Sequence, residues 1–207
     1  MSLTQDKRRK LSERFLLPLL RRLVDLPDAE WEFLADHLRL VRLDPGERFT
    51  QFGEVADRFG VVTEGVLCKR HLVDSGESFV RGFAAEADLV GAYVSLLTEA
   101  PSELSVEAVT RAEVLAVPYA VMDILYSRHA CWERIGRRLA ESFLIEREYR
   151  AAQLLTCDAT ARYLDFLTTH NHLIGRVREA DVASYLGITP VSLSRIKARL
   201  RVQGQLV

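Results

Sequence analysis

The residues with the clearest chemistry lie in one segment near the C-terminal end, from Arg178 to Leu200. Gly187 suits a tight turn, Thr189 can cap the free N–H groups at a helix start, and Pro190 suits the first helical position. Apolar residues recur at helical spacing on both sides of this turn. The pattern predicts a helix-turn-helix, with an ordinary pair of antiparallel helices as the alternative.

The second predicted helix has one apolar face and one face suited to DNA. With Leu193 and Ile196 inward, Val191 and Arg195 lie opposite, because successive residues of a helix turn by about 100°. An arginine can bond O6 and N7 of guanine, whereas a valine can touch only a thymine methyl. Neighbouring cations suit phosphates, which supply affinity without sequence choice. The residues expected to contact DNA are Arg178, Thr189, Pro190, Val191, Ser192, Arg195, Lys197 and Arg199.

The charge is unevenly distributed. The formal net charge is −1. Basic residues nevertheless outnumber acidic ones by seven to two in residues 1–22 and by six to two in residues 175–207. Basic ends on an acidic body favour a local partner such as nucleic acid over non-specific binding.

Periodicity divides the rest of the chain. Residues 11–38 have helical spacing with a helix start near Pro27, and residues 119–155 return to it. Between them, residues 39–118 contain short alternating runs separated by turn signals, which predict a small β-sandwich or barrel. Asp158 can cap a further helix.

The second helical stretch carries one apolar face at roughly heptad spacing. Such a long helix favours pairing with a second copy of itself, although covering the open face of a β-domain would give the same pattern. We therefore expect a homodimer. The face comprises Trp132, Ile135, Leu139, Ser142, Glu146 and Tyr149, and it is widened by Phe143, Leu144 and Ile145. The expected domains are a β-domain with N-terminal helices (1–125), a dimerisation helix and hinge (126–156) and a DNA-binding domain (157–207).

Composition and motifs exclude several classes. The chain of 207 residues is 48% hydrophobic and 28% charged, which predicts a folded protein. It has no apolar stretch long enough for a membrane span and no signal peptide, so we expect a cytoplasmic protein without membrane contact. Cys68, Cys131 and Cys157 fit neither a disulfide framework nor a zinc site. No catalytic motif is present, so we expect no enzyme, no catalytic residue and no metal ligand.

Six features carry a resemblance to a known family: Leu43–Gly46, Phe59–Gly65, Gly91, Ala108–Glu113, Asp158–Leu167 and the helix-turn-helix. Over roughly residues 15–206, the sequence resembles the CRP/FNR family of bacterial transcription regulators. The resemblance implies an α+β fold with an N-terminal β-roll of the cyclic-nucleotide-binding type, a long dimerisation helix and a C-terminal winged helix-turn-helix. It also implies a homodimer on double-stranded DNA and contact with RNA polymerase.

The effector positions depart from the family. Ala92 follows Gly91 where members carry the Glu that holds a ribose, and Ser102 and Glu103 stand where an Arg-Ser pair holds the phosphate. Losing the cation removes the strongest phosphate anchor. We therefore expect an effector pocket at these four positions that takes no cAMP or cGMP, or senses nothing.

The cysteine and histidine positions bear on three other cofactor types. No cysteine precedes Cys68, which argues against an iron–sulfur cluster. Cys68 and His71 could ligate haem, or could be a packed strand residue and a surface histidine. His170 and His172 suit a metal or a polar loop. The alternative function is therefore a sensor of haem or another small ligand that acts mainly through protein contacts.

Two departures concern DNA. Many members carry a Glu at the position of Val191, so the half-site should differ at the base that this Glu reads, whereas Arg195 is retained. Val207 follows shortly after Gly204, where members continue into a wing hairpin, so either the wing is unusually short or the chain is truncated.

An effector would act by biasing the hinge near Asp158, and with it the spacing of the two recognition helices in the dimer.

Overall fold

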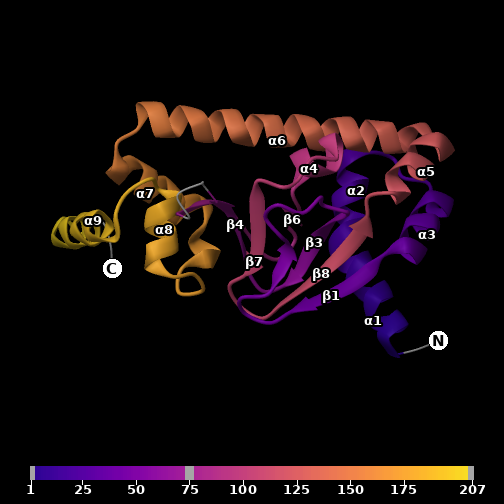
Figure 1. Cartoon of the computed structure of the whole chain (residues 1–207), viewed down its shortest axis with the longest axis horizontal. Coiled ribbons are helices and arrows are strands. Elements are labelled where there is room, and N and C mark those ends of the chain that lie inside the picture. The colour runs from indigo at the N-terminus through magenta and orange to yellow at the C-terminus, as the bar shows by residue number, and fades with distance from the viewer. Residues whose placement is uncertain (1–2, 73–76, 205–207) are drawn as a thin grey trace.

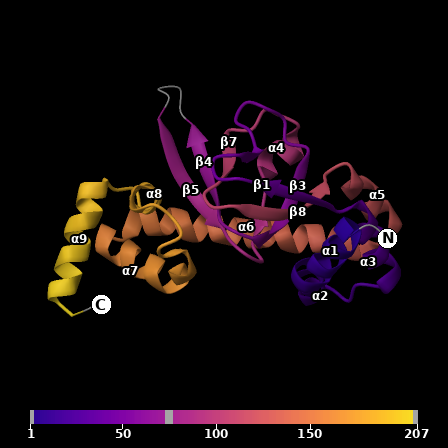
Figure 2. The ribbon, with the colours of Figure 1, turned by 90° about the horizontal axis from the view of Figure 1, so that it is seen from below.

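A computed structural model describes residues 3–72 and 77–204. The molecule is elongated, with a β-roll between a group of N-terminal helices and a C-terminal helical domain (Figure 1). One long helix, α6, runs beside all three parts (Figures 1 and 2). No helix in the described ranges has the length and apolar character needed to cross a bilayer.

The N-terminal helices agree with the spacing predicted for residues 11–38. Pro27 stands at the N-cap of α3, where its fixed φ and missing N–H cost little, so the predicted helix start is confirmed. Leu20, Trp31 and Leu34 are buried here in a cluster that also receives the start of α6. The elements are α1 (Leu3–Leu11), the π-helical turn η1 (Ser12–Leu16), α2 (Leu17–Leu23) and α3 (Asp28–His37).

The β-roll consists of two four-stranded sheets in which every strand pair is antiparallel. The strand orders are β1-β8-β3-β6 and β2-β7-β4-β5. Val62, Leu67, Val106 and Val114 are fully buried between the sheets. The strands are β1 (Arg39–Leu43), β2 (Arg48–Thr50), β3 (Arg58–Glu64), β4 (Leu67–Leu72), β5 (Ser78–Ala84), β6 (Leu89–Val90), β7 (Leu104–Ala108) and β8 (Ala112–Pro118). A short helix that the sequence did not indicate, α4 (Tyr93–Thr98), interrupts the strands.

The second helical stretch is two helices, α5 (Val121–Arg128) and α6 (Ala130–Thr156). They are separated at His129, whose backbone is extended and whose Nδ1 accepts a 3.1 Å hydrogen bond from the Cys131 N–H. At the start of α6, Trp132 and Ile135 are buried in the N-terminal cluster. This end of α6 is therefore anchored to its own chain.

The C-terminal domain is built from α7 (Ala159–Thr169), the short 3₁₀ turn η2 (Asn171–Leu173), α8 (Glu179–Tyr185) and α9 (Pro190–Val202). Asp158 caps α7 by accepting a 2.8 Å hydrogen bond from the Ala161 N–H, so this predicted helix start is confirmed. Gly204 is the last described residue, and the question of a wing beyond it lies outside the described residues.

Candidate functional site

Helices α8 and α9 form the predicted two-helix unit. Gly187 follows α8 with φ +69°, a left-handed conformation that costs other residues about 1 kcal/mol. Thr189 caps α9, because its Oγ1 accepts a 3.2 Å hydrogen bond from the Ser192 N–H, and Pro190 occupies the first turn. Ala183 is completely buried where α8 meets its neighbours. The turn, cap and small residue thus have the structural roles predicted for them.

The two faces of α9 also lie as predicted. Leu193, Ile196 and Leu200 are buried in the core of the C-terminal domain. On the other side Val191 is 61% exposed, and Arg195 is exposed with no partner among the described residues. In Figure 2, α9 lies at one end of the molecule, and α7 and α8 of the same domain lie on its inner side. An arginine held free on an exposed helix is sterically available to another molecule.

The cations beside this face are engaged within the chain. Arg178 donates to Asp181 at 2.9 Å, Lys197 is ion-paired with Glu179, and Arg199 donates to the Thr160 hydroxyl. The Arg178 side chain is still 71% exposed. A phosphate would have to share or replace these contacts, whereas Arg195 has none to release.

The C-terminal domain contacts the β-roll through polar groups. Asp181 is 4% exposed and accepts a second charged hydrogen bond, at 3.0 Å, from Arg70 on β4. The Val80 N–H on β5 donates to Ser184 Oγ at 3.0 Å. Since both links reach α8 from the β4–β5 hairpin, the roll and the helix-turn-helix are directly connected.

A further ion pair joins the same two parts. Arg176 donates to both carboxylate oxygens of Glu86, at 2.9 and 2.6 Å, and the Gly65 N–H donates to the same carboxylate. The Arg176 hydrogen bonds outweigh partial desolvation and lower the pKa of Glu86 to about 2. This carboxylate is therefore ionised across the physiological range.

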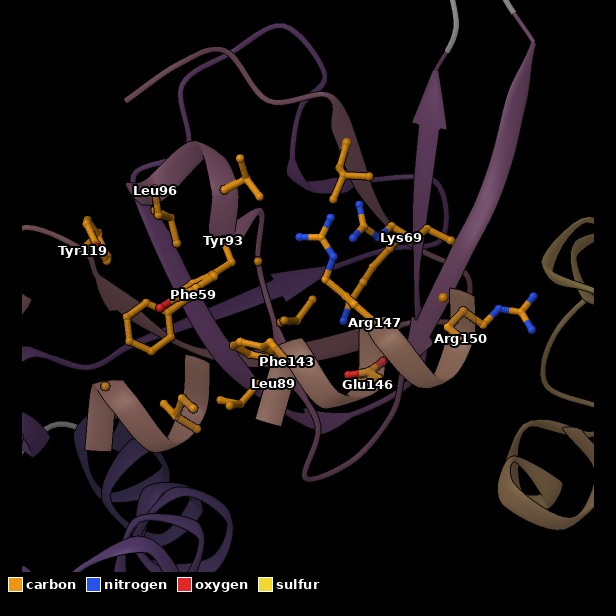
Figure 3. A pocket seen from close by; sticks show the side chains of 18 of the residues that line it. Phe59, Lys69, Leu89, Tyr93, Leu96, Tyr119, Phe143, Glu146, Arg147 and Arg150 are labelled. Atoms are coloured by element: carbon orange, nitrogen blue, oxygen red, sulfur yellow. The ribbon is translucent and has the colours of Figure 1, made fainter. Parts of the chain in front are cut away.

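A cavity of about 350 Å³ lies between the β-roll and α6 (Figure 3). Aromatic rings form one part of its wall: Tyr93 and Phe143 pack with centroids 5.2 Å apart, and Phe59 and Tyr119 at 6.5 Å. The other part carries cationic side chains. These come from β4, β5 and α6 and are Lys69, Arg81, Arg147 and Arg150, with Glu146 nearby.

Of the predicted effector positions, only Gly91 lines this cavity. Ala92 is 2% exposed, and buried Ser102 uses its hydroxyl to bond the backbone of Leu104, at 2.8 and 3.1 Å. Glu103 lies near His71 and Arg81. The structure therefore does not bring these four residues together around one ligand space.

Cys68 and His71, the candidate haem ligands, do not line the cavity either. Cys68 is fully buried, and burial raises the pKa of its thiol to about 12, which disfavours the thiolate needed for ligation. His71 Nε2 lies 3.0 Å from an Arg81 nitrogen, and burial followed by that arginine lowers its pKa. His170 stacks on Phe166 at 5.1 Å, and within the described residues no three His, Cys, Asp or Glu side chains form a group suited to a metal.

The long helix presents its predicted pairing face to its own chain. Trp132 and Ile135 are buried, Leu139 and Glu146 line the cavity, and Tyr149 donates a 3.0 Å hydrogen bond to Asp165. Ser142 is exposed, and its hydroxyl donates to the Arg138 carbonyl within α6 itself. Covering the β-domain, the alternative for this pattern, therefore accounts for most of it.

A different face of α6 is both apolar and uncovered. Leu144, Ile145 and Leu155 are 59%, 69% and 86% exposed. No helix or strand of the described ranges lies beside the outer side of α6 (Figure 1). The sequence places Leu144 and Ile145 beside the predicted pairing face, and the structure shows that they lie on the uncovered side of the helix together with Leu155, which the pattern did not include.

The cyclic nucleotide-binding domain family matches residues 40–129. Among solved structures, FixK2 from Bradyrhizobium japonicum is 20% identical with a TM-score of 0.72, covering 81% of this chain and 86% of that one. The c-di-GMP responsive regulator CLP from Xanthomonas campestris is 20% identical with a TM-score of 0.66, over 86% and 93% of the two chains. A regulator assigned to the CRP/FNR family from Eubacterium rectale is 17% identical with a TM-score of 0.69, over 87% and 86%.

These findings establish the fold. The β-roll matches the cyclic nucleotide-binding domain family, and more than four fifths of the chain shares the fold of FixK2, CLP and the regulator assigned to the CRP/FNR family, so the predicted fold is confirmed. No curated protein matches the sequence.

Proposed function

We propose that the protein is a homodimeric, sequence-specific DNA-binding transcription regulator of the CRP/FNR type. The observation that carries the proposal is the outer face of α9. Arg195 and Val191 are exposed on this face, while the opposite face of the helix is packed in the core of the C-terminal domain. The fold shared with known regulators supports it. In this proposal residues 1–125 sense an effector, residues 126–156 pair two copies and residues 157–207 bind DNA.

The DNA-contacting residues divide into two groups. Pro190, Val191, Ser192 and Arg195 lie at the N-terminal end of α9, the end that approaches base edges when a recognition helix enters the major groove. Arg195 bonds a guanine, and Val191 contacts a thymine methyl. Arg178, Thr189, Lys197 and Arg199 lie around them and hold phosphates.

Dimerisation would use the outer face of α6. Leu144, Ile145 and Leu155 are exposed to water, and burying them in an interface is favourable. A two-fold axis beside α6 would bring the same three side chains from both copies together, which doubles the buried apolar area. The same axis relates two recognition helices. A symmetric dimer then reads two half-sites about one DNA turn, ~34 Å, apart.

The proposal is tested by selecting duplex DNA with the purified full chain at stated salt and without added ligand. We expect an enriched two-fold-symmetric site. On that site Arg195→Ala weakens binding by ~1–3 kcal/mol and relaxes the choice at one base pair in each half-site. Arg201→Ala is the matched control, since Arg201 is an exposed arginine of α9 that lies outside the proposed reading face.

Two results would contradict the proposal. One is a selection without enrichment, in which duplex binding stays weak and insensitive to sequence, as for a module acting through protein contacts. The other is an unchanged base preference in Arg195→Ala, which would remove the assigned role of this side chain.

A further inference from the structure

The cavity beneath α6 holds an unusual group of charges. Lys69 on β4, Arg81 on β5 and Arg147 on α6 all line it. Lys69 and Arg147 form no hydrogen bond or ion pair with any described residue, and Arg81 has only the uncharged ring of His71. Figure 3 shows Lys69 and Arg147 toward the same side of the space, away from Phe59. The three cations come together without a carboxylate bonded to them.

The strand pairing explains how two of them meet. Lys69 pairs with Gly82, but Arg70 pairs with Val80, so Arg81 is the extra residue of a β-bulge. A bulge redirects a side chain that would otherwise alternate with its neighbours. Gly82, which pairs with Lys69, lines the cavity without a side chain, and a Cβ added there would meet no atom within 4 Å, so this part of the wall stays open.

The charges are costly in the present arrangement. Burial lowers the pKa of Lys69, and burial together with Arg147 lowers the pKa of Arg81, so both cations are held where their charge is disfavoured. Glu146 lies close enough to both cations to offset part of this, as do Asp88 for Lys69 and Glu103 for Arg81, but none of the three carboxylates forms an ion pair with these cations. Buried charges in proteins are normally paired. An anion in the cavity would supply the missing partner.

The rest of the wall indicates the body of such a ligand. Phe59, Tyr93 and Phe143 and several aliphatic side chains surround the space away from the cations. A volume of about 350 Å³ is at the lower end of small-molecule sites. The occupant must then be small, with an apolar body and an acidic group at one end.

We propose that this cavity binds a small organic acid, a carboxylate or phosphate monoester with an apolar body, whose anionic group lies among Lys69, Arg81 and Arg147. The inference names the effector class of the proposed regulator and rests on that function for its regulatory meaning. It differs from cyclic nucleotide binding through the family's phosphate cassette, because Ala92, Ser102 and Glu103 do not line the cavity.

The test is calorimetric titration of the full-length protein without DNA, using four probes. Naphthalene-2-carboxylate and 2-naphthyl phosphate represent the two acids, naphthalene-2-carboxamide is the neutral isostere, and cAMP represents the cyclic nucleotides. We expect at least one acid to bind at least ~10-fold more tightly than the amide, since a charge-assisted hydrogen bond is about twice as strong as a neutral one. Which acid binds distinguishes a carboxylate from a phosphate effector.

Variants then locate the anionic group. Arg147→Gln and Lys69→Gln should each reduce the affinity for that acid ~10-fold or more and leave the weak amide binding unchanged. Arg138→Gln is the matched control, an exposed arginine of the same helix that does not line the cavity. Thermal unfolding of each variant confirms that it is folded.

Four results would overturn the inference: no acid binding at millimolar concentrations, equal affinity for acid and amide, unchanged affinity in both variants, or tight cAMP binding that neither variant weakens. Because the titration contains no DNA and the selection above contains no ligand, the two proposals can fail separately. Acid binding without sequence-selective DNA binding would leave a sensor that is not a DNA-binding regulator.

Discussion

Leu155→Ala is the sharpest test of the proposed dimer. Leu155 is 86% exposed on the outer face of α6, so in the single chain its side chain contributes little to the fold. The substitution removes three carbon atoms, and burying each carbon completely contributes about 0.8 kcal/mol to binding. Because most of the side chain is exposed before pairing, its loss should cost ~2 kcal/mol of dimerisation free energy per copy. A two-fold interface contains the residue twice, which gives ~4 kcal/mol per dimer. The dimer dissociation constant should rise about 1000-fold.

Sedimentation equilibrium over a range of protein concentrations measures this constant directly. Leu97→Ala is the matched control, because Leu97 on α4 is 56% exposed and lies outside α6. Both variants should unfold within about 0.5 kcal/mol of the unmodified chain when monomeric. The reasoning is refuted if Leu155→Ala and the equivalent change at Leu144 leave the dissociation constant unchanged, or if Leu97→Ala weakens the dimer equally.

Two further substitutions test the positioning of the helix-turn-helix. Glu86→Gln should lower the free energy of unfolding by ~1–2 kcal/mol at pH 7, a value discounted for solvent screening. Because the pKa of Glu86 falls from 4.5 to about 2 in the folded chain, this difference should persist above pH 4.5 and vanish as the pH falls through about 2. A pH-independent difference in urea titrations, with exposed Glu64→Gln as control, would contradict it. Gly187→Ala should cost ~1 kcal/mol through its positive φ, and Gly187→Asn less; equal costs in the same titrations would argue against backbone strain.

The helix-turn-helix could be predicted in detail because its determinants are local. The turn at Gly187, the cap at Thr189 and the first-turn proline act on residues at most a few positions away. The inward positions of α9 follow from the helical repeat alone. For the same reason the cap at Asp158 and the helix start at Pro27 were correct.

The cavity could not be predicted in this way because its residues are distant in the sequence. Lys69, Arg81 and Arg147 meet only through strand register, a β-bulge and the position of α6 over the roll. No spacing in the sequence encodes any of these three. The motif positions that a family resemblance supplied instead, Ser102 and Glu103, lie outside the cavity in this chain.

The long helix shows why periodicity alone was ambiguous. Apolar residues at alternating steps of three and four indicate that one side of a helix is covered. The spacing does not indicate whether another part of the same chain or a second copy covers it. Here Trp132 and Ile135 meet the N-terminal helices, and Phe143 meets the cavity. The side that a second copy could cover is marked only by the exposure of Leu144 and Leu155, a property of the folded chain.

The same helix brings the cavity and the helix-turn-helix into one set of contacts. Arg150 lines the cavity, yet its guanidinium donates to the carbonyl of Tyr185 at the end of α8 and lies 4.0 Å from the Tyr185 ring centroid. Arg147 is one helical turn earlier, among the cations that have no bonded carboxylate. A ligand shifts an equilibrium only through contacts that differ between its two states. An anion bound at Arg147 would act next to a residue that already holds α8, and α8 in turn holds the turn that positions Arg195.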